Sequence, residues 1–333
     1  MVAGMGKGAV KPRSEGRHEP ERGRHQDASE ILLIVNPAAG AGRVRREWPR
    51  LAAEIRGEGI EFEEVFTSRP GEATDLARAA VKEGRRVVAA VGGDGILHEV
   101  VNGFFEGGEP IPTHSVLGLI PFGTGSDTRR SFEIPDGLPA ARILVEGRAR
   151  ALDAGRVTVG GRVLHFINVA EAGIGADVSD RVNRAPKTLG GRVSFLIGTL
   201  QGLAAWKHKP MKVVVDGRET RELVAQAVTV ANCQYYGSGM RVAPRAVPDD
   251  GWFDVLISGA FGKLEGLKGL RKIYAGEHLD DPALAAKLEF FHATRVEVSS
   301  PVPVLVQLDG EVVGELPAVF ELLPKAIRLL VPA

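Results

Sequence analysis

The sequence predicts an α/β domain with a parallel sheet, followed by a mostly antiparallel β-sandwich domain. Three observations predict this fold class. Up to about residue 150, short apolar runs alternate with stretches of helical periodicity, which is typical of βαβ units. Three of these runs are followed at once by glycine-rich turns. Beyond residue 150 the runs are short, rich in valine and leucine, and joined by hairpin signals, which favours a sandwich.

The first half begins with the apolar run Ile31–Val35, which Asn36 and Pro37 terminate. Such a run is typical of a buried strand. The same reasoning predicts further strands at 61–66, 86–91 and 116–120. Helices are expected near 44–57, near 71–84, after Gly95 and near 137–147.

Two dipeptides in the second half indicate hairpin turns, because glycine and aspartate accept the positive φ that tight turns need. Gly160-Gly161 separates 156–159 from 162–166, and Asp216-Gly217 separates 211–215 from 222–230. Further strands are expected at 253–258, 294–299, 303–308, 318–323 and 327–331. Helices are expected near 190–206 and 262–275.

Charge, cysteine content and hydropathy exclude several classes of protein. The 42 basic and 42 acidic residues cancel, so the chain has no general field that would attract nucleic acid. Cys233 is the only cysteine, which excludes an internal disulfide and fits a reducing compartment. No apolar run reaches the length of about 18 residues that a membrane-spanning helix needs. We expect a cytoplasmic protein and leave peripheral contact with a membrane open.

Four segments follow from these patterns. Residues 1–30 mix charges, glycines and prolines, so we expect a disordered tail. Residues 31–150 are expected to form the α/β domain, and residues 151–325 the β-rich domain. Residues 326–333 form a terminal segment.

Three glycine-rich loops should meet at one edge of the sheet. They follow the runs that end at Val35, Val91 and Ile120, and read Asn36-Pro-Ala-Ala-Gly40-Ala-Gly42-Arg43, Gly92-Gly-Asp94-Gly95 and Pro121-Phe-Gly-Thr-Gly-Ser-Asp127. Ligands of open parallel sheets bind at the carboxyl ends of the strands. Glycine lets backbone N–H groups approach phosphate oxygens, and the helix after Gly95 adds its positive end. Arg43, Arg45 and Arg46 offer positive charge nearby.

A single glycine turn after a strand is more often ordinary loop chemistry, but three on consecutive strands indicate a polyphosphate site. The familiar phosphate motifs G-x-x-x-x-G-K-[ST] and G-x-G-x-x-G are both absent from these positions. The site is therefore of another kind.

The three loops resemble the catalytic domain shared by diacylglycerol kinases, sphingosine and ceramide kinases and bacterial lipid kinases. Gly92-Gly-Asp-Gly95 with Glu99-Val-Val-Asn-Gly103 is similar to that family's signature. In the second half, Pro248-Asp-Asp-Gly-Trp-Phe-Asp254 and Asp309-Gly-Glu311 also resemble family motifs. The resemblance covers nearly all of residues 31–333 and implies a Rossmann-like first domain of the NAD kinase and diacylglycerol kinase type. It also implies that the terminal segment packs back on the first domain.

The resemblance implies an ATP-dependent lipid kinase that uses Mg²⁺, with phospholipid metabolism as its setting. It assigns nucleotide contacts to residues of all three loops and to one threonine after the second strand: Asn36, Pro37, Ala38, Ala39, Gly40, Thr67, Gly92, Gly93, Asp94, Gly95, Ile96, Leu97, His98 and Thr124. It assigns a second magnesium to Asp250 and to the carbonyls of Val247 and Trp252. A tight Asp-Asp-Gly turn suits a hard cation, although it is equally read as a plain turn.

Phosphoryl transfer needs a carboxylate that takes the proton of the acceptor hydroxyl. The resemblance points to Glu311, with Asp309 beside it, and Asp94 is a second candidate near the phosphates. Without the resemblance, Asp309-Gly310 reads more simply as a hairpin turn.

Three positions depart from the family pattern. Ile96 and Ser126 stand where threonine and asparagine are usual, and His98 stands where asparagine is common. Ile96 removes a hydroxyl beside the phosphate loop, and one hydrogen bond to a charged group is worth about 1.5–3 kcal/mol. We expect a working kinase with weakened nucleotide binding, since the backbone N–H groups remain.

The lipid is not identified by the sequence. Residues 193–206 carry an apolar face flanked by Arg192, Lys207 and Lys209, which fits either an interfacial helix or a helix packed on the β domain. Arg241 is a candidate contact for a lipid head group, or an ordinary surface arginine. A homodimer is implied only by the resemblance.

Two other functions stay open. An NAD kinase-like enzyme also uses Gly-Gly-Asp-Gly between two such domains. A nucleotide- or lipid-binding protein without catalysis would fit Ile96 and Ser126, although the intact Asp94, Asp309 and Glu311 argue against it.

Overall fold

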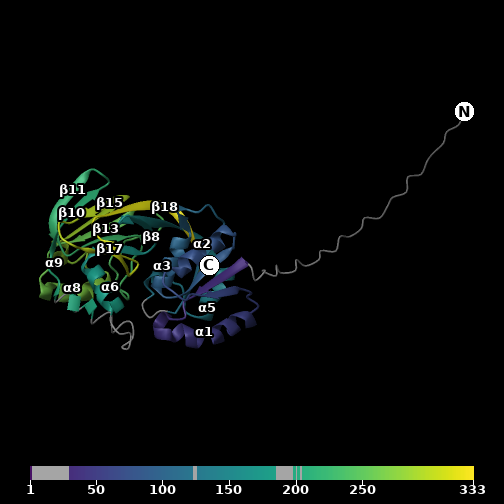
Figure 1. Cartoon of the computed structure of the whole chain (residues 1–333). Coiled ribbons are helices and arrows are strands. Elements are labelled where there is room, and N and C mark those ends of the chain that lie inside the picture. Colours follow the sequence, from purple (N-terminus) through teal and green to yellow (C-terminus); the bar gives the residue numbers. More distant parts are fainter. Residues whose placement is uncertain (2–29, 123–125, 185–197, 200, 203–204) are drawn as a thin grey trace.

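The chain folds into two halves joined by a shared β-sheet (Figure 1). The computed structural model describes residues 1, 30–122, 126–184, 198–199, 201–202 and 205–333. Residues 2–29 of the expected tail at 1–30 and most of the expected helix at 190–206 therefore lie outside the described residues. The first half contains β1 (Ile31–Val35), α1 (Ala39–Gly57), β2 (Glu63–Phe66), α2 (Glu72–Lys82), β3 (Val87–Gly92), α3 (Asp94–Gly103), β4 (Phe105–Glu106), β5 (Glu109–Pro110), β6 (Val116–Pro121), α4 (Asp127–Ser131) and α5 (Leu138–Glu146).

Four parallel strands form the centre of the first half, in the order β6-β3-β1-β2. Every residue of β1, β3 and β6 is buried, as expected for strands covered on both faces. The helices supply that cover, with α1 and α5 packed together on one face and α2 and α3 on the other. The predicted α/β domain is confirmed.

The second half is a sandwich of two sheets. Its elements are β7 (Arg148–Val159), β8 (Arg162–Phe166), β9 (Val169–Gly173), α6 (Ile174–Arg184), β10 (Lys209–Val215), β11 (Glu219–Ala225), β12 (Ala227–Ala231), β13 (Phe253–Ser258), α8 (Lys263–Ala275), α9 (Pro282–Ala285), β14 (Leu288–Ala293), β15 (Arg295–Ser299), β16 (Leu305–Leu308), β17 (Glu311–Glu315) and β18 (Ala318–Val331). Six antiparallel strands, β14-β13-β12-β9-β16-β17, face a second sheet that contains β11-β10-β15-β18 with β7 and β8.

Aromatic side chains from both sheets fill the space between them. Phe166 of β8 stacks on Phe253 of β13 at 5.6 Å between ring centroids, and Phe320 of β18 joins the same core. These rings are completely buried. The predicted β-sandwich is therefore confirmed.

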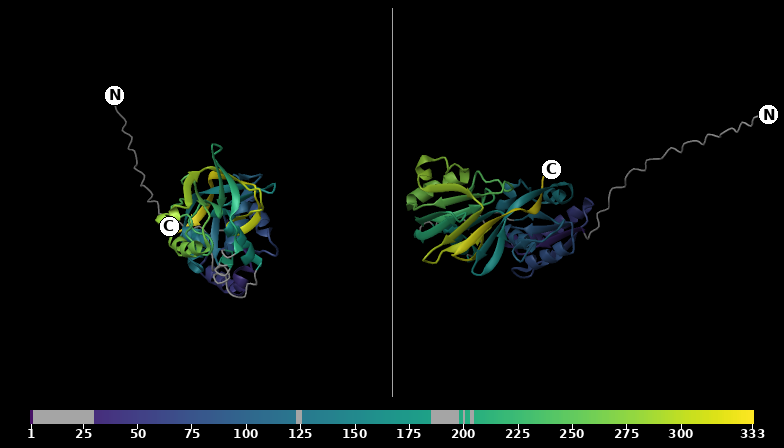
Figure 2. Two further views of the ribbon diagram at one scale, coloured as in Figure 1. Left: turned by 90° about the vertical axis from the view of Figure 1, so that its left-hand side faces the viewer. Right: turned by 90° about the horizontal axis from the view of Figure 1, so that it is seen from above.

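β18 connects the two halves. It pairs antiparallel with β7 and β15, and its end lies parallel to β6 with Leu329 opposite Leu117. A single sheet thus runs from the sandwich into the α/β half, and Figure 2 shows β18 (yellow) crossing between them. Leu329 and Val331 are buried in the core of the first half.

Three of the hairpin turns between described strands use residues in the left-handed region. The φ angles are 55° and 73° at Gly160-Gly161, 48° and 66° at Asp216-Gly217, and 52° and 93° at Asp309-Gly310. The first two turns were predicted as hairpins and are confirmed. The third is also a hairpin, between β16 and β17.

The strand predictions were wrong at two places, and not every helix was expected. The expected strand 222–230 breaks at Gln226, whose N–H bonds to the carbonyl of Ser258, so that β11 and β12 belong to different sheets. The expected strands 318–323 and 327–331 are one strand, β18, with a bulge held by a hydrogen bond from Lys325 N–H to Asp153 Oδ1. Helix α6, directly after β9, was not expected.

The side-chain amide of Asn102 bonds the two halves together. Its Oδ1 accepts the N–H of His165 at 2.9 Å, and its Nδ2 donates to the His165 carbonyl at 2.9 Å. Asn102 lies on α3 and His165 on β8, which pairs with β7 alone in the sheet. The amide thus takes the place of a neighbouring strand at this buried edge.

Asn102→Ala should lower the free energy of unfolding by about 1–3 kcal/mol, because it leaves buried backbone groups of His165 without partners. Urea denaturation would measure the change, with Glu61→Ala, at an exposed position, as the control. Equal stability of the two variants would show that the amide does not join the halves.

Candidate active site

The three glycine-rich loops are bonded to one another at the carboxyl edge of the parallel sheet. The N–H of Asn36 donates to the Val91 carbonyl at 3.2 Å, and the N–H of Phe122 donates to the Gly92 carbonyl at 2.8 Å. A Cβ atom added at Gly40 would lie 3.2 Å from the Phe122 carbonyl oxygen. The described parts of the three loops are therefore connected to one another through their backbones.

The first loop turns sharply before α1 continues. Gly40, Ala41 and Gly42 all have positive φ, at 59°, 55° and 77°. The Asn36 side chain stabilises the start of the loop by accepting the N–H of Ala38 at 2.9 Å. Glycine avoids the strain of the left-handed region at two of these positions, whereas Ala41 adopts it with a side chain.

A cleft of about 1210 Å³ opens beside these loops. It is lined by seven of the residues predicted to contact nucleotide and by one predicted catalytic residue: Asn36, Pro37, Ala38, Thr67, Gly95, Ile96, His98 and Glu311. The cleft is therefore lined by residues of both halves.

Four arginines that also line the cleft are Arg45, Arg69, Arg78 and Arg162. Of the three arginines considered from the sequence, Arg45 lines it, whereas Arg43 pairs with Glu47 at 2.8 Å. Arg46 donates to the Ala41 carbonyl at 3.4 Å. The basic side chains suit an anionic ligand.

Several other residues that were predicted to contact nucleotide do not line the cleft. Gly92 and Gly93 connect β3 to α3, and Ala39 packs beside Gly92. The Leu97 side chain is buried in the core, and its N–H donates to the Gly93 carbonyl. Thr124 lies outside the described residues.

The positive end of α3 faces the cleft. The helix begins at Asp94, two residues earlier than the sequence suggested, so the N–H groups of Gly95 and Ile96 belong to its first turn. The first N–H groups of a helix lack partners within the helix and carry partial positive charge. Ile96 is 4% exposed and packs over Gly92, where a Cβ would lie 2.8 Å from its Cγ2.

The Glu311 carboxylate approaches this helix end closely. A Cβ atom added at Gly95 would lie only 2.7 Å from Glu311 Oε1. Glu311 is the first residue of β17 and is exposed. Because Gly95 has no side chain, the Glu311 carboxylate of the second half can lie against the second glycine-rich loop of the first half.

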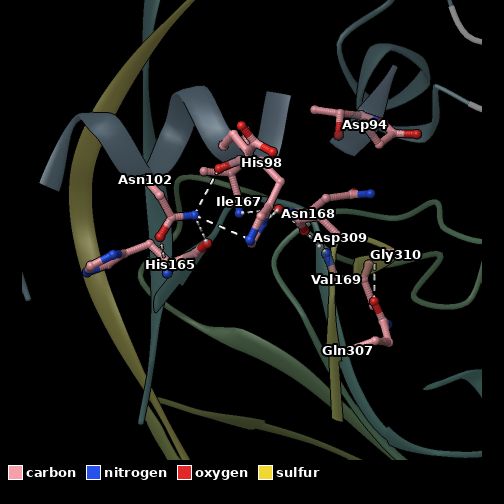
Figure 3. A network of polar contacts seen from close by, with 12 residues as sticks. Asp94, His98, Asn102, His165, Ile167, Asn168, Val169, Gln307, Asp309 and Gly310 are labelled. Atoms are coloured by element: carbon pink, nitrogen blue, oxygen red, sulfur yellow. Dashed lines mark hydrogen bonds and ion pairs between the residues drawn. The ribbon is translucent and has the colours of Figure 1, made fainter. Parts of the chain in front are cut away.

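The Asp309 carboxylate is buried and bonded to backbone. It accepts the N–H groups of Ile167, Asn168 and Val169 at 3.3, 3.0 and 3.1 Å, as Figure 3 shows. His98 Nδ1 lies 3.5 Å from Asp309 Oδ2. Both carboxylate oxygens are thus in use, which favours Glu311 over Asp309 as an acceptor for a proton from a ligand.

Asp94 turns toward the third loop. Its carboxylate accepts the N–H of Asp127 at 3.1 and 3.0 Å and that of Thr128 at 3.4 Å. Burial raises the pKa of Asp94, and the charge of Asp309 raises it further. Asp94 and Asp127 form a pair of carboxyls beside the loops.

Asp127 was not singled out from the sequence. Its Oδ2 accepts the N–H of Ser238 at 2.8 Å, which connects the third loop to the second half. Burial raises its pKa to about 8, with a contribution from the negative charge of Asp94. The signal for it was its place as the only acid in the third glycine loop.

The second predicted cation position is a well-ordered turn. Asp250 Oδ1 accepts the N–H of Trp252 at 3.0 Å, and Asp153 Oδ2 accepts the N–H of Gly251 at 2.8 Å. Val247 and Trp252 are both partly exposed, at 42% and 46%.

The oxygens of this turn fit a hard cation such as Mg²⁺. Asp250 keeps one carboxylate oxygen besides the one bonded to Trp252. Nearby, Asp254 Oδ2 is buried and has no hydrogen-bond partner within the described residues. Burial raises the pKa of Asp254 to about 6, and the charge of Asp250 adds to that rise. Among the described residues no three His, Cys, Asp or Glu side chains gather as metal ligands, so carbonyls or water would complete the set.

Asp127→Asn should flatten the decline of stability with rising pH. The folded pKa of about 8 lies above the unfolded value of about 3.9, so the folded state binds the proton more tightly between these values. The stabilisation is complete below the unfolded pKa and is lost as the pH rises through about 8. Urea denaturation at a series of pH values, without nucleotide, would measure it. Glu61→Gln is the control, and equal slopes for the two variants would contradict the account.

None of the described helices combines the length and the hydropathy that crossing a membrane requires.

Comparison with known proteins agrees with both halves of this arrangement. Residues 30–157 match the diacylglycerol kinase catalytic domain, and residues 168–331 match the YegS C-terminal NAD kinase beta sandwich-like domain. A crystal structure of a diacylglycerol kinase from Bacillus anthracis str. Sterne has the same fold, with a TM-score of 0.67 and 21% identity, over 92% of this chain and 98% of that one.

Two relatives cover nearly the whole chain. The diacylglycerol kinase of Mycobacterium tuberculosis (strain ATCC 25618 / H37Rv) is 30% identical over 315 residues, which are 93% of this chain and 97% of that protein. The diacylglycerol kinase of Bacillus subtilis (strain 168) is 29% identical over 303 residues, 90% of this chain and 95% of that protein. The chain therefore belongs to the diacylglycerol kinase family.

Proposed function

We propose that the chain is an ATP-dependent lipid kinase that transfers the γ-phosphate of ATP to a hydroxyl of diacylglycerol or a related lipid. The observation that carries this proposal is the approach of the Glu311 carboxylate to Gly95, at the positive end of α3. A candidate base in the second half thus lies beside the backbone N–H groups of the first half that would bind phosphate. The named activity of the relatives supports it.

In the proposed reaction, the three loops and the end of α3 hold the phosphates through backbone N–H groups. The lipid hydroxyl attacks the γ-phosphorus while the bond to the bridging oxygen of ADP breaks. Glu311 accepts the proton that the hydroxyl loses, and ADP leaves with the bridging oxygen. Magnesium, when bound with the nucleotide, would neutralise phosphate charge.

The Asp94 and Asp127 pair is the group that would hold magnesium with the nucleotide. A cation beside the pair would favour their charged forms. Without it, burial raises the pKa of both carboxyls, and the charge of Asp309 adds to the rise at Asp94 while that of Asp94 adds to the rise at Asp127. Asp250, with the carbonyls of Val247 and Trp252, would bind the second ion. This ion would stabilise the turn.

An apolar cavity of about 110 Å³ in the second half supports a lipid acceptor. Its wall includes Ile174 and Val178 of α6, Leu256 of β13 and Ile273 of α8. Helix α6 also packs against β17, the strand that carries Glu311. A lipid chain lodged in this half would therefore lie one helix away from the proposed base.

Glu311→Gln should lower kcat by about 10²- to 10⁴-fold, the usual contribution of a general base, with ATP affinity unchanged. Transfer of label from γ-labelled ATP to mixed micelles of diacylglycerol, sphingosine, ceramide or phosphatidylglycerol would measure it. Glu315→Gln, at the exposed far end of the same strand, is the matched control.

Labelled lipid from wild type and from Glu315→Gln, but not from Glu311→Gln, would establish the kinase and name its lipid. Transfer to NAD and to no lipid would show an NAD kinase-like enzyme. ATP binding without transfer to any alcohol would show a binding protein.

A further inference from the structure

Helix α8 presents large apolar side chains to solvent. Leu264 is 76% exposed, Leu267 is 50% exposed and Tyr274 is 40% exposed. At 100° per residue these three positions fall within one third of the helix circumference, so they form a single strip. Such a strip of exposed large side chains on one helix marks an interaction surface.

The opposite side of α8 is occupied. Gly266, Gly269, Leu270 and Ile273 line the apolar cavity described above. Leu264, Leu267 and Tyr274 are absent from that lining. The core therefore does not account for the outer strip.

The outer strip lies among positive charges. Helix α8 carries four basic residues, Lys263, Lys268, Arg271 and Lys272, and one acidic residue, Glu265. Glu265 is bonded to Lys287, just before β14, at 2.9 and 2.7 Å, and Lys272 is bonded to Glu277 at 2.9 Å. Both charges are therefore compensated, and the positive excess rests on Lys263, Lys268 and Arg271. Arg271 lies on the same side of the helix as the strip, between Leu267 and Tyr274. The chain as a whole is electrically balanced, so this excess is local.

An aromatic and basic patch continues the strip beyond the start of α8. Trp206, Lys207 and His208 line a hollow together with Phe261 and Lys263. The Lys209 ammonium lies 4.9 Å from the centre of the Trp206 ring. Lysine side chains with an apolar stem and a charged tip are typical of residues at the boundary between lipid and water.

We propose that the outer face of α8, with the patch around Trp206, docks on the surface of an anionic lipid bilayer. Leucine and tyrosine would enter the head-group region, and the lysines and arginine would contact anionic head groups. A second copy of the chain is a poorer occupant, because two such faces in contact would bring their positive charges together. The argument for membrane docking depends only on the exposed side chains of this surface. The further idea that docking supplies the lipid substrate rests on the proposed kinase activity.

Helix α8 would separate the apolar cavity from the bilayer. Since the inner face of α8 lines the apolar cavity and its outer face would rest on the bilayer, this helix would be the wall between membrane and cavity. Figure 1 shows α8 beside α6 at one edge of the second half, with β10 and β11 at the opposite edge. The molecule would therefore dock with that edge toward the membrane.

Co-sedimentation of the full chain with vesicles tests the proposal. The vesicles contain phosphatidylcholine alone or phosphatidylcholine and phosphatidylglycerol in equal parts. The double variant Leu264→Glu/Leu267→Glu should lower binding to the anionic vesicles by about tenfold or more, because it removes apolar burial and adds repelling charge. Lys268→Glu/Arg271→Glu should lower binding to anionic vesicles only, and added salt should do the same to wild type.

Val224→Glu is the matched control, because Val224 is 54% exposed and lies on β11, at the opposite edge. It should bind vesicles as wild type does. Thermal unfolding of all variants should be unchanged, since the replaced side chains lie outside the core.

Binding by the leucine variant equal to that of wild type would overturn the proposal, as would a wild type that does not bind anionic vesicles. Self-association in sedimentation that the leucine variant abolishes, without vesicle binding, would assign the face to a second copy instead. Transfer to a short-chain diacylglycerol dispersed as single molecules separates the two proposals. Vesicle binding without transfer to this lipid or to any of the four lipids tested above leaves docking standing and refutes the kinase, and transfer without vesicle binding does the reverse.

Discussion

The bonds from three consecutive backbone N–H groups to the Asp309 carboxylate hold the turn on which the candidate site depends. Hydrogen bonds to a carboxylate are roughly twice as strong as those between neutral groups, so they fix this turn against the link between β8 and β9. Gln307 Oε1 accepts the N–H of Gly310 at 2.7 Å and fixes the other half of the turn. Glu311 follows directly. The placement of its carboxylate above Gly95 thus originates in a buried network of the sandwich.

That placement also requires the two halves to keep their alignment. β18 supplies a covalent and hydrogen-bonded connection, since one strand pairs with β15 in the sandwich and with β6 in the α/β half. The amide of Asn102 adds two directional hydrogen bonds between α3 and β8, and His98 Nδ1 of α3 lies 3.5 Å from Asp309 Oδ2. Figure 3 shows these contacts as one chain of polar groups. Apolar packing alone would leave the angle between the halves less defined, because it is not directional.

The features that the sequence predicts best are local. Glycine after a buried strand and Asp-Gly between two strands depend on φ preferences of one or two residues, and the first two glycine-rich loops and the Asp-Gly turns lie where they were expected. The features that it missed depend on partners far along the chain. Asp127 becomes part of a carboxyl pair only because the folded sheet brings it to Asp94. The break at Gln226 arises because its partner, Ser258, lies in the other sheet. The roles of Asp309 as a hairpin residue and as a motif residue, which the sequence set against each other, are compatible, because its backbone makes the turn while its carboxylate binds three N–H groups.

The most direct test is a double-mutant cycle on phosphoryl transfer with Asp309→Asn, Glu311→Gln and the combined variant. If Asp309 acts only by holding Glu311 in place, Asp309→Asn should lower kcat, and the combined variant should be no slower than Glu311→Gln alone. ATP affinity and unfolding of each variant establish that the loops and the fold are intact. Losses that multiply in the combined variant would contradict the account, because they would mean that Asp309 contributes to the transfer independently of Glu311.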